Sequence, residues 1–275
     1  MVTAAAAIDR KGTDPEDRIR YNGGNHTLYK RNVMNEQVNK WTRAVTLRDA
    51  FARSLNTAFA RLAIEKLVPR DLGDYAFRFG FNREIAGDIK FDQGYTEIPE
   101  DQGYELAEVA SGFNRITRMS PLQGALMAAA IANDGVMPKP RLIDYATKAN
   151  GDVIYESKAE MDLQVLTPAA ADKMKVLMEE TIASGTSRKS FRQIRKDRKL
   201  QDLEIGGKTG SLQGTNPKGK TDWFVGYAID ENGDKLAIAA VTVHIDRWRV
   251  KSAELAQTLV RSHFKNAKNW IAKHP

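Results

Sequence analysis

Three strand-like stretches in the last third of the chain constrain the fold most. Residues 203–210, 222–229 and 235–244 are rich in Val, Ile, Ala and aromatic side chains, and such runs are typical of β-strands. The segment from Glu231 to Asp234 separates the last two runs and contains Asn-Gly. A turn this tight joins strands that pair antiparallel. The sequence therefore predicts an antiparallel sheet near the C-terminus.

The first two thirds of the chain show helical patterns instead. Apolar residues recur three or four positions apart from Thr46 onward, and Pro69 is expected to close that helix. Ser120-Pro121 and Thr167-Pro168 are expected to begin two more helices, because Ser and Thr cap helix starts and proline fits the first turn. A last amphipathic helix is expected over residues 251–273. Helices followed by an antiparallel sheet predict an α+β fold rather than a doubly wound parallel sheet.

Shorter elements are predicted from local turn signals. Residues 17–30 indicate two short strands around the Asn-Gly-Gly-Asn segment 22–25. A second hairpin is expected about Asn150-Gly151. Residues 80–118 show no strong periodicity and predict a long irregular connection with short helices. Residues 1–8 are expected to be the tail of a helix, since the alanine-rich pattern is helical from the first residue without a cap.

Composition excludes several kinds of site. The chain has no cysteine, which rules out disulfides, thiolate zinc sites and a cysteine nucleophile. The four histidines are scattered along the sequence and do not indicate a metal site, so neither a metal nor a cofactor is expected. They are His26, His244, His263 and His274. No apolar run is long enough to cross a bilayer, and no targeting signal stands at the start.

A net charge of +7 favours anionic partners, and part of the excess is concentrated within residues 188–199. Aromatic side chains interleaved with those charges would indicate nucleic-acid binding, but only Phe191 lies among them. We therefore expect no nucleic-acid partner and interpret this stretch as a solvated face or a mobile loop.

Two short motifs carry possible chemistry. Ser54-Leu55-Asn56 is an S-x-N triplet, of which composition predicts about 0.5 by chance. Lys208-Thr209-Gly210 is a K-T-G triplet, for which the chance expectation is only about 0.1. The K-T-G lies on an expected strand, follows Gly206-Gly207, precedes Ser211, and is soon followed by Trp223-Phe224-Val225-Gly226-Tyr227.

In this order the motifs resemble those of penicillin-binding protein transpeptidase domains and the related serine β-lactamases. Gly207 to Ser211 and Asp222 to Ala228 resemble two strands of that family. Ser120-Pro121-Leu122-Gln123, followed by Ile131 to Gly135, resembles a helix common in its transpeptidases, and Gly185-Thr186 fits as well. The likeness covers essentially the whole chain. We therefore expect one transpeptidase-like domain over residues 1–275, helical to about residue 200, with the sheet and last helix over 201–275.

The family's first motif, S-x-x-K, is where this sequence departs from the pattern. Residues 1–8 resemble the family segment that follows the lysine of that motif, so the N-terminal part of the domain is expected to be missing. The sequence contains S-x-x-K only at Ser262 to Lys265, after the K-T-G and thus in the wrong order. We interpret it as a coincidence on the last helix.

The resemblance implies roles in acyl transfer. Ser54 would relay a proton to the leaving group, Asn56 would hold the substrate amide, and Lys208 would place positive charge beside the substrate carboxylate. Thr209, Gly210 and Ser211 would form the substrate-binding strand, with the Thr209 hydroxyl as a donor and the Ser211 N–H in the oxyanion hole. The implied partners are the peptidoglycan stem peptide and β-lactams, and the implied location is the extracytoplasmic cell envelope.

Three functional hypotheses stay open from the sequence. The first is a D,D-transpeptidase-type domain that lacks its serine nucleophile in this chain and is inactive alone. The second is the same enzyme with its first residues missing from the sequence. The third is a non-catalytic cell-wall or partner-binding module that reuses the fold. A β-lactamase-like hydrolase is less favoured, because S-D-N is absent.

Overall fold

A computed structural model describes residues 1–271 except 89, 159, 216, 217 and 246, so the end of the expected last helix and His274 lie outside the described residues. The helices of the described part are α1 (Val2–Lys11), α2 (Lys30–Val33), α3 (Leu47–Ala52), α4 (Asn56–Lys66), α5 (Pro69–Arg78), α6 (Tyr104–Ser111), α7 (Pro121–Ala132), α8 (Pro168–Ala183), α9 (Arg192–Lys196) and α10 (Ser252–Ile271). The strands are β1 (Arg18–Tyr21), β2 (Arg43–Thr46), β3 (Val136–Pro138), β4 (Tyr145–Thr147), β5 (Val153–Glu156), β6 (Met161–Gln164), β7 (Glu204–Thr215), β8 (Lys218–Ile229) and β9 (Lys235–His244).

The largest sheet of the described chain is three-stranded, with the order β7-β8-β9 and antiparallel pairing throughout. This confirms the predicted α+β class and the antiparallel pairing of the last two strands. β7 and β8 are longer than the sequence indicated, because their ladder continues from Glu204↔Ile229 to Thr215↔Lys218. Lys208 therefore lies within β7, opposite Val225, rather than near the end of a strand.

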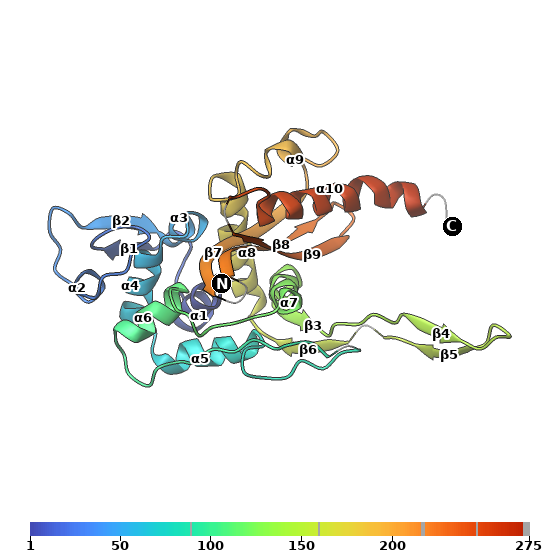
Figure 1. Ribbon diagram of the computed structural model, residues 1–275, viewed down its shortest axis with the longest axis horizontal. Coiled ribbons are helices and arrows are strands. Elements are labelled where there is room, and N and C mark those ends of the chain that lie inside the picture. The colour runs from blue at the N-terminus through green and yellow to red at the C-terminus, as the bar shows by residue number, and fades with distance from the viewer. Residues whose placement is uncertain (89, 159, 216–217, 246, 272–275) are drawn as a thin grey trace.

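Helices cover both faces of this sheet (Figure 1). Tyr227 joins the core cluster of α1, α4, α7 and α8 on one face. Phe224, Ile238 and Ala240 point to the other face and pack with Phe191 and with Ala256 of α10. This division follows from the two-residue period of a strand, which sends neighbouring side chains to opposite faces.

Helix caps at three predicted positions are formed as the sequence indicated. The side chains of Thr46, Ser120 and Thr167 accept hydrogen bonds from backbone N–H groups in the first turns of α3, α7 and α8. α1 is also present near the N-terminus, and Ala4 to Ala7 are fully buried there. Small side chains on this helix allow close packing against α4, α5 and α8.

One local expectation is wrong, and another is only part of what the structure shows. Residues 17–30 do not form a hairpin around 22–25, because β1 pairs instead with β2, in the register Arg18↔Thr46. The helical stretch expected to close at Pro69 does end before it, with α4 at Lys66, and Pro69 itself begins α5, where its missing N–H costs no hydrogen bond. Burial explains the first difference: the register places Ile19 and Val45 together in the main core.

The hairpin predicted about Asn150-Gly151 is present as β4 and β5. It extends away from the rest of the structure (Figure 1). At its base, Asp88 accepts hydrogen bonds from the N–H groups of Leu142 and Ile143, at 2.9 and 3.1 Å. Side chains of the hairpin such as Tyr145 and Ile154 are exposed, so backbone pairing and this anchor hold it rather than a core of its own.

Candidate active site

The S-x-N segment interrupts the helix that the sequence predicted from Thr46 onward. Ser54 lies between α3 and α4 with a φ of 55°, in the left-handed region that non-glycine residues rarely adopt. The N–H groups of Ser54 and Leu55 bond back to the carbonyls of Phe51 and Ala50. α4 then begins at Asn56. This break turns the Ser54 side chain toward β7.

Lys208 of β7 meets Ser54 although 154 residues separate them. Its Nζ donates to Ser54 Oγ at 2.8 Å and to the carbonyl of Thr209 at 2.7 Å. The ammonium group also lies 5.7 Å from the centre of the Phe51 ring. Burial lowers the pKa of Lys208 to about 8, because a charged amine loses solvation there. The S-x-N and K-T-G motifs thus form one polar site.

A loop over residues 24–27, to which no sequence motif assigned a role in the site, holds Asn56 beside this contact. Asn56 Nδ2 donates to the carbonyl of His26 at 3.2 Å, and His26 Nδ1 lies 3.0 Å from the carbonyl oxygen of Ser54. The hydroxyl of buried Thr57 donates to the carbonyl of Gly24 at 2.5 Å. Residues 24–27 therefore brace the S-x-N segment. No local signal indicates these contacts, because they join positions about 30 residues apart.

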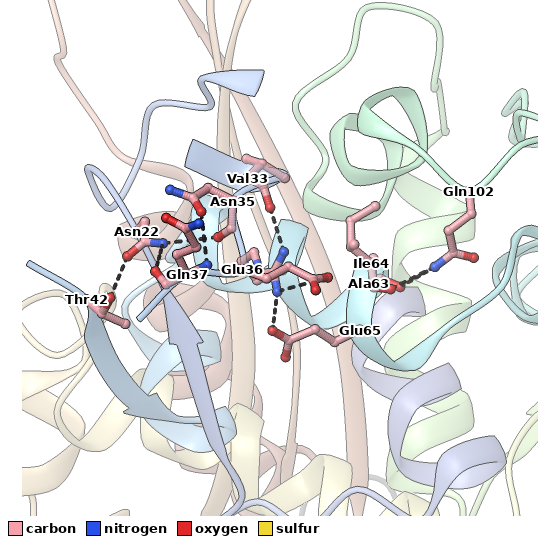
Figure 2. Close-up of polar contacts among 11 residues, drawn as sticks. Asn22, Val33, Asn35, Glu36, Gln37, Thr42, Ala63, Ile64, Glu65 and Gln102 are labelled. Atoms are coloured by element: carbon pink, nitrogen blue, oxygen red, sulfur yellow. Dashed lines mark hydrogen bonds and ion pairs between the residues drawn. The ribbon is translucent and has the colours of Figure 1, made fainter. Parts of the chain in front are cut away.

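The loop is tied down in turn by buried polar side chains (Figure 2). Asn22 Nδ2 donates to the carbonyls of Asn35 and Gln37, and its Oδ1 accepts from Thr42. Arg61 of α4 donates to the carbonyl of Val33 at 2.8 Å and also pairs with Glu65. Because Arg61 is almost fully buried, these bonds fix the residue 22–42 region against α4.

The other residues of the K-T-G strand have separate partners. Thr209 Oγ1 lies 2.6 Å from Thr186 Oγ1, which links β7 to the turn after α8. Gly210 is exposed, and the nearest atom to an added Cβ would be Cβ of Trp223 at 3.7 Å. Ser211 donates its hydroxyl to Asp222 Oδ1 at 2.9 Å. Space beside Gly210 leaves this part of the strand open to a ligand.

Asp222 is a second residue that the sequence analysis did not assign to the site. Only 5% of it is exposed. Besides the Ser211 hydroxyl, it accepts from the N–H and the hydroxyl of Ser252, both at 2.9 Å, at the start of α10. The carboxylate thus joins the residue after the K-T-G to the last helix. Asp222 directly precedes the strand residue Trp223 and pairs with Ser211 across β7 and β8. This position in the expected strand could have identified it as a site residue.

The start of α1 also lies at the site. The Met1 amino group is buried, and burial first and the charge of Lys208 second lower its pKa to about 5. The second S-x-x-K, by contrast, lies on α10. Ser262 borders a groove against Leu236 to Ala239 of β9, and Lys265 forms an ion pair with Asp197. This placement agrees with the interpretation of that match as a coincidence.

The described residues contain no group of three or more His, Cys, Asp and Glu side chains placed to hold a metal ion. Among those same residues, no helix has both the length and the apolar character that a bilayer span requires.

The family model for the penicillin binding protein transpeptidase domain matches residues 1–262. The chain belongs to the penicillin-binding protein transpeptidase family. It is 32% identical over 213 residues to penicillin-binding protein 2a of Streptococcus pneumoniae. The matched segment covers 75% of this chain and 25% of that protein. It is 25% identical over 226 residues to penicillin-binding protein PbpB of Mycolicibacterium smegmatis, covering 79% of this chain and 33% of that protein. The chain thus spans a quarter to a third of these relatives.

Solved structures of penicillin-binding proteins share the fold. The D,D-transpeptidase domain of a peptidoglycan glycosyltransferase from Eggerthella lenta matches with a TM-score of 0.74 and 22% identity, covering 98% of this chain and 64% of that one. Penicillin-binding protein A from M. tuberculosis, as its imipenem acyl-enzyme complex, matches with a TM-score of 0.72 and 21% identity, covering 95% and 58%. That protein thus forms a covalent complex with imipenem.

Proposed function

We propose that this chain supplies the Ser54, Asn56 and Lys208 part of a peptidoglycan D,D-transpeptidase site in the cell envelope. The hydrogen bond between Lys208 Nζ and Ser54 Oγ carries the proposal, since it joins two motifs that lie far apart in the sequence. Acyl transfer needs a proton path to the leaving group and a positive group beside the substrate carboxylate. Ser54 and Lys208 are suited to these two tasks, and Lys208 is charged below its pKa of about 8.

The remaining residues take binding roles in this proposal. Asn56 keeps its side-chain oxygen for the substrate amide N–H, because its Nδ2 already donates to His26. The Thr209 hydroxyl donates to the substrate carboxylate, and the strand at Gly210 and Ser211 lines the scissile bond. The Ser211 N–H forms one half of the oxyanion hole. These assignments rest on the chain's membership of the family and on the single site that the S-x-N and K-T-G motifs form together.

In this proposal the serine nucleophile and its lysine base are supplied from outside residues 1–275, since residues 1–8 resemble the family segment that follows that lysine. No serine of the chain is followed by a lysine three positions later in the family's motif order. A serine needs such a base to attack a carbonyl. The chain alone is therefore expected to be unreactive.

A fluorescent penicillin tests both parts of the proposal. The chain as it stands should take up no covalent label, and a stoichiometric adduct on Ser54 or Ser262 would contradict the proposed roles. The chain extended at Met1 by a segment that ends in S-x-x-K should be labelled on the added serine. In that protein Lys208→Ala should slow acylation by about ten- to a hundredfold, because a charge-assisted hydrogen bond is lost.

Lys235→Ala is the matched control, since Lys235 is exposed at the start of β9 in the same sheet. It should leave the acylation rate unchanged. If the extended protein folds but stays unlabelled, the alternative function becomes the better one: a non-catalytic cell-wall or partner-binding module that reuses the fold. Muropeptide binding without acylation would then be the activity to measure.

A further inference from the structure

A dense group of cations surrounds α9, and we call it the α9 basic surface. All seven of its members are exposed. They are Arg188, Lys189, Arg192, Arg195, Lys196, Arg198 and Lys199. The one carboxylate within the same stretch is Asp197, which already pairs with Lys265 of α10. The local positive charge is therefore not balanced from within the stretch.

The backbone that carries these cations is packed on the sheet, so the stretch is a solvated face rather than a mobile loop, the two alternatives that the sequence left open. Phe191, Ile194 and Leu200 are buried, and the Phe191 ring stacks on Phe224 of β8 at 5.3 Å. Arg195 donates to the carbonyls of Ala183 and Arg188 at 2.9 and 2.8 Å. Apolar anchors every three to six residues hold the stretch on the sheet, so the charges stay grouped.

None of the seven cations has a counter-ion in the described part of the chain. Arg195 donates to carbonyl groups, and no ion pair involves any member of the surface. Like charges this close repel one another, and a bound anion would relieve the repulsion. Four of the seven are arginines, whose forked donors match carboxylate or phosphate oxygens in pairs. The surface is thus suited to a ligand with several negative groups.

The position of the surface relates it to the candidate active site. Thr186 contacts Thr209 of the K-T-G strand, and Arg188 follows only two residues later. Figure 1 shows α9 and its flanking loops at the top of the view, above α10. A flexible ligand lying along β7 could therefore continue onto these cations.

The side chains also narrow the chemistry of the ligand. The one aromatic residue of the stretch, Phe191, is fully buried and offers no ring to a nucleic-acid base. No large apolar side chain from position 183 to 203 is exposed to enter a lipid layer. What remains is recognition of repeated anionic groups on a flexible chain. The strand next to the surface is, in the proposed function, the one that binds a peptide.

We propose that the α9 basic surface binds an acidic peptide chain through its carboxylates, as a subsite beside the K-T-G strand. The choice of a peptide and its assignment to the cell-wall substrate rest on the proposed function, whereas binding of a flexible polyanion to these cations does not. The interaction is electrostatic and exposed to solvent, so it must weaken steeply as salt is added.

Fluorescein-labelled poly-L-glutamate of about ten residues is the probe, with binding followed by fluorescence anisotropy between about 20 and 200 mM salt. The wild-type chain should bind it at low salt. The triple variant Arg192→Gln, Lys196→Gln, Lys199→Gln should bind about tenfold more weakly and with a shallower salt dependence. The three residues are exposed and form no ion pair among the described residues, so the variant should keep its unfolding temperature.

The matched control removes the same charge elsewhere, by Lys30→Gln, Arg31→Gln and Lys40→Gln, which are also exposed. It should bind poly-L-glutamate like the wild type. Equal loss in both triple variants, or none in the α9 variant, would show that only net charge matters and would overturn the proposal. Tighter binding of polyphosphate or oligothymidylate of matched charge would overturn the assignment to an acidic peptide. Because this assay needs no acylation, an unreactive extended chain that still binds the probe would contradict the proposed function alone.

Discussion

The strand that carries Lys208 and the segment that carries Ser54 and Asn56 are held in place by different kinds of contact. β7 pairs with β8 over twelve residues, and backbone hydrogen bonds therefore set the position of Lys208. The S-x-N segment has no such ladder. It depends on side chains, including Thr57 and His26, and on a loop that Asn22 and Arg61 hold. One half of the site should tolerate most side-chain changes, and the other should not.

The largest effect is expected where a side chain would disrupt the ladder itself. A Cβ on Gly226 would lie 2.4 Å from the carbonyl oxygen of Gly206 in the paired strand. Gly226→Ala should therefore lower the free energy of unfolding by about 3 kcal/mol, measured by urea denaturation. Gly210→Ala, where the nearest atom is 3.7 Å away, is the control and should change it by less than about 0.5 kcal/mol. Equal effects would refute the importance of this close approach.

The next prediction concerns the half of the site held by side chains. Arg61→Met should cost about 2 kcal/mol, because the buried carbonyl of Val33 loses its donor and Glu65 its partner. Hydrogen exchange should also speed up at the N–H of Thr57, which bonds the carbonyl of Asn25. Arg70→Ala removes an exposed ion pair with Asp74 and should cost under about 0.5 kcal/mol. Unchanged exchange at Thr57 would show that Arg61 does not support the loop.

A smaller effect is expected from the backbone of Ser54. Its φ of 55° suits glycine better than a residue with a Cβ. Ser54→Gly should therefore be about 1 kcal/mol more stable than Ser54→Ala, since both lose the hydrogen bond from Lys208 and only glycine relieves the strain. Thermal unfolding of the two variants measures the difference. The opposite order would mean that the left-handed conformation carries no strain here.

The smallest effect is expected at the base of β7, where Glu179 of α8 approaches Glu204 and Tyr227. Burial and then the charge of Glu204 raise the pKa of Glu179 above its usual value. A raised carboxyl pKa means that stability is fully present below the ordinary pKa and falls as pH rises through the folded-state value. Glu179→Gln should thus be more stable than wild type near neutral pH, by less than about 1 kcal/mol. The two proteins should converge near pH 4, in matched denaturation curves.

Local patterns predicted some elements well and others poorly, for physical reasons. The caps at Ser120 and Thr167 and the hairpin between β8 and β9 depend on neighbouring residues, so the sequence indicates them directly. The pairing of β1 with β2 joins residues more than twenty positions apart, so no local pattern indicates it. The turn signal at 22–25 favoured a different pairing, between two strands on either side of that turn. Pro69 marks the boundary between α4 and α5, but a proline alone does not show that a helix lies on both of its sides.

The candidate site shows the same limit. Its two motifs are visible in the sequence, and the resemblance supplied their expected proximity. The contacts of Ser54 with His26, and of Ser211 with Asp222, follow from tertiary packing that no motif spacing encodes. The catalytic and binding roles of these residues stay predictions until acylation is measured.

The carboxylate of Asp222 has a consequence for how the site comes together during synthesis of the chain. It joins Ser211 to Ser252, so one end of the K-T-G strand is completed only when α10 docks. A ribosome releases these residues in order, and Ser54 emerges almost two hundred positions before Ser252. In the nascent chain, the Asp222 end of the β7–β8 pair therefore lacks its Ser252 partner until α10 has emerged. During that interval the unfinished sheet is open to chaperones or to mispairing with another chain.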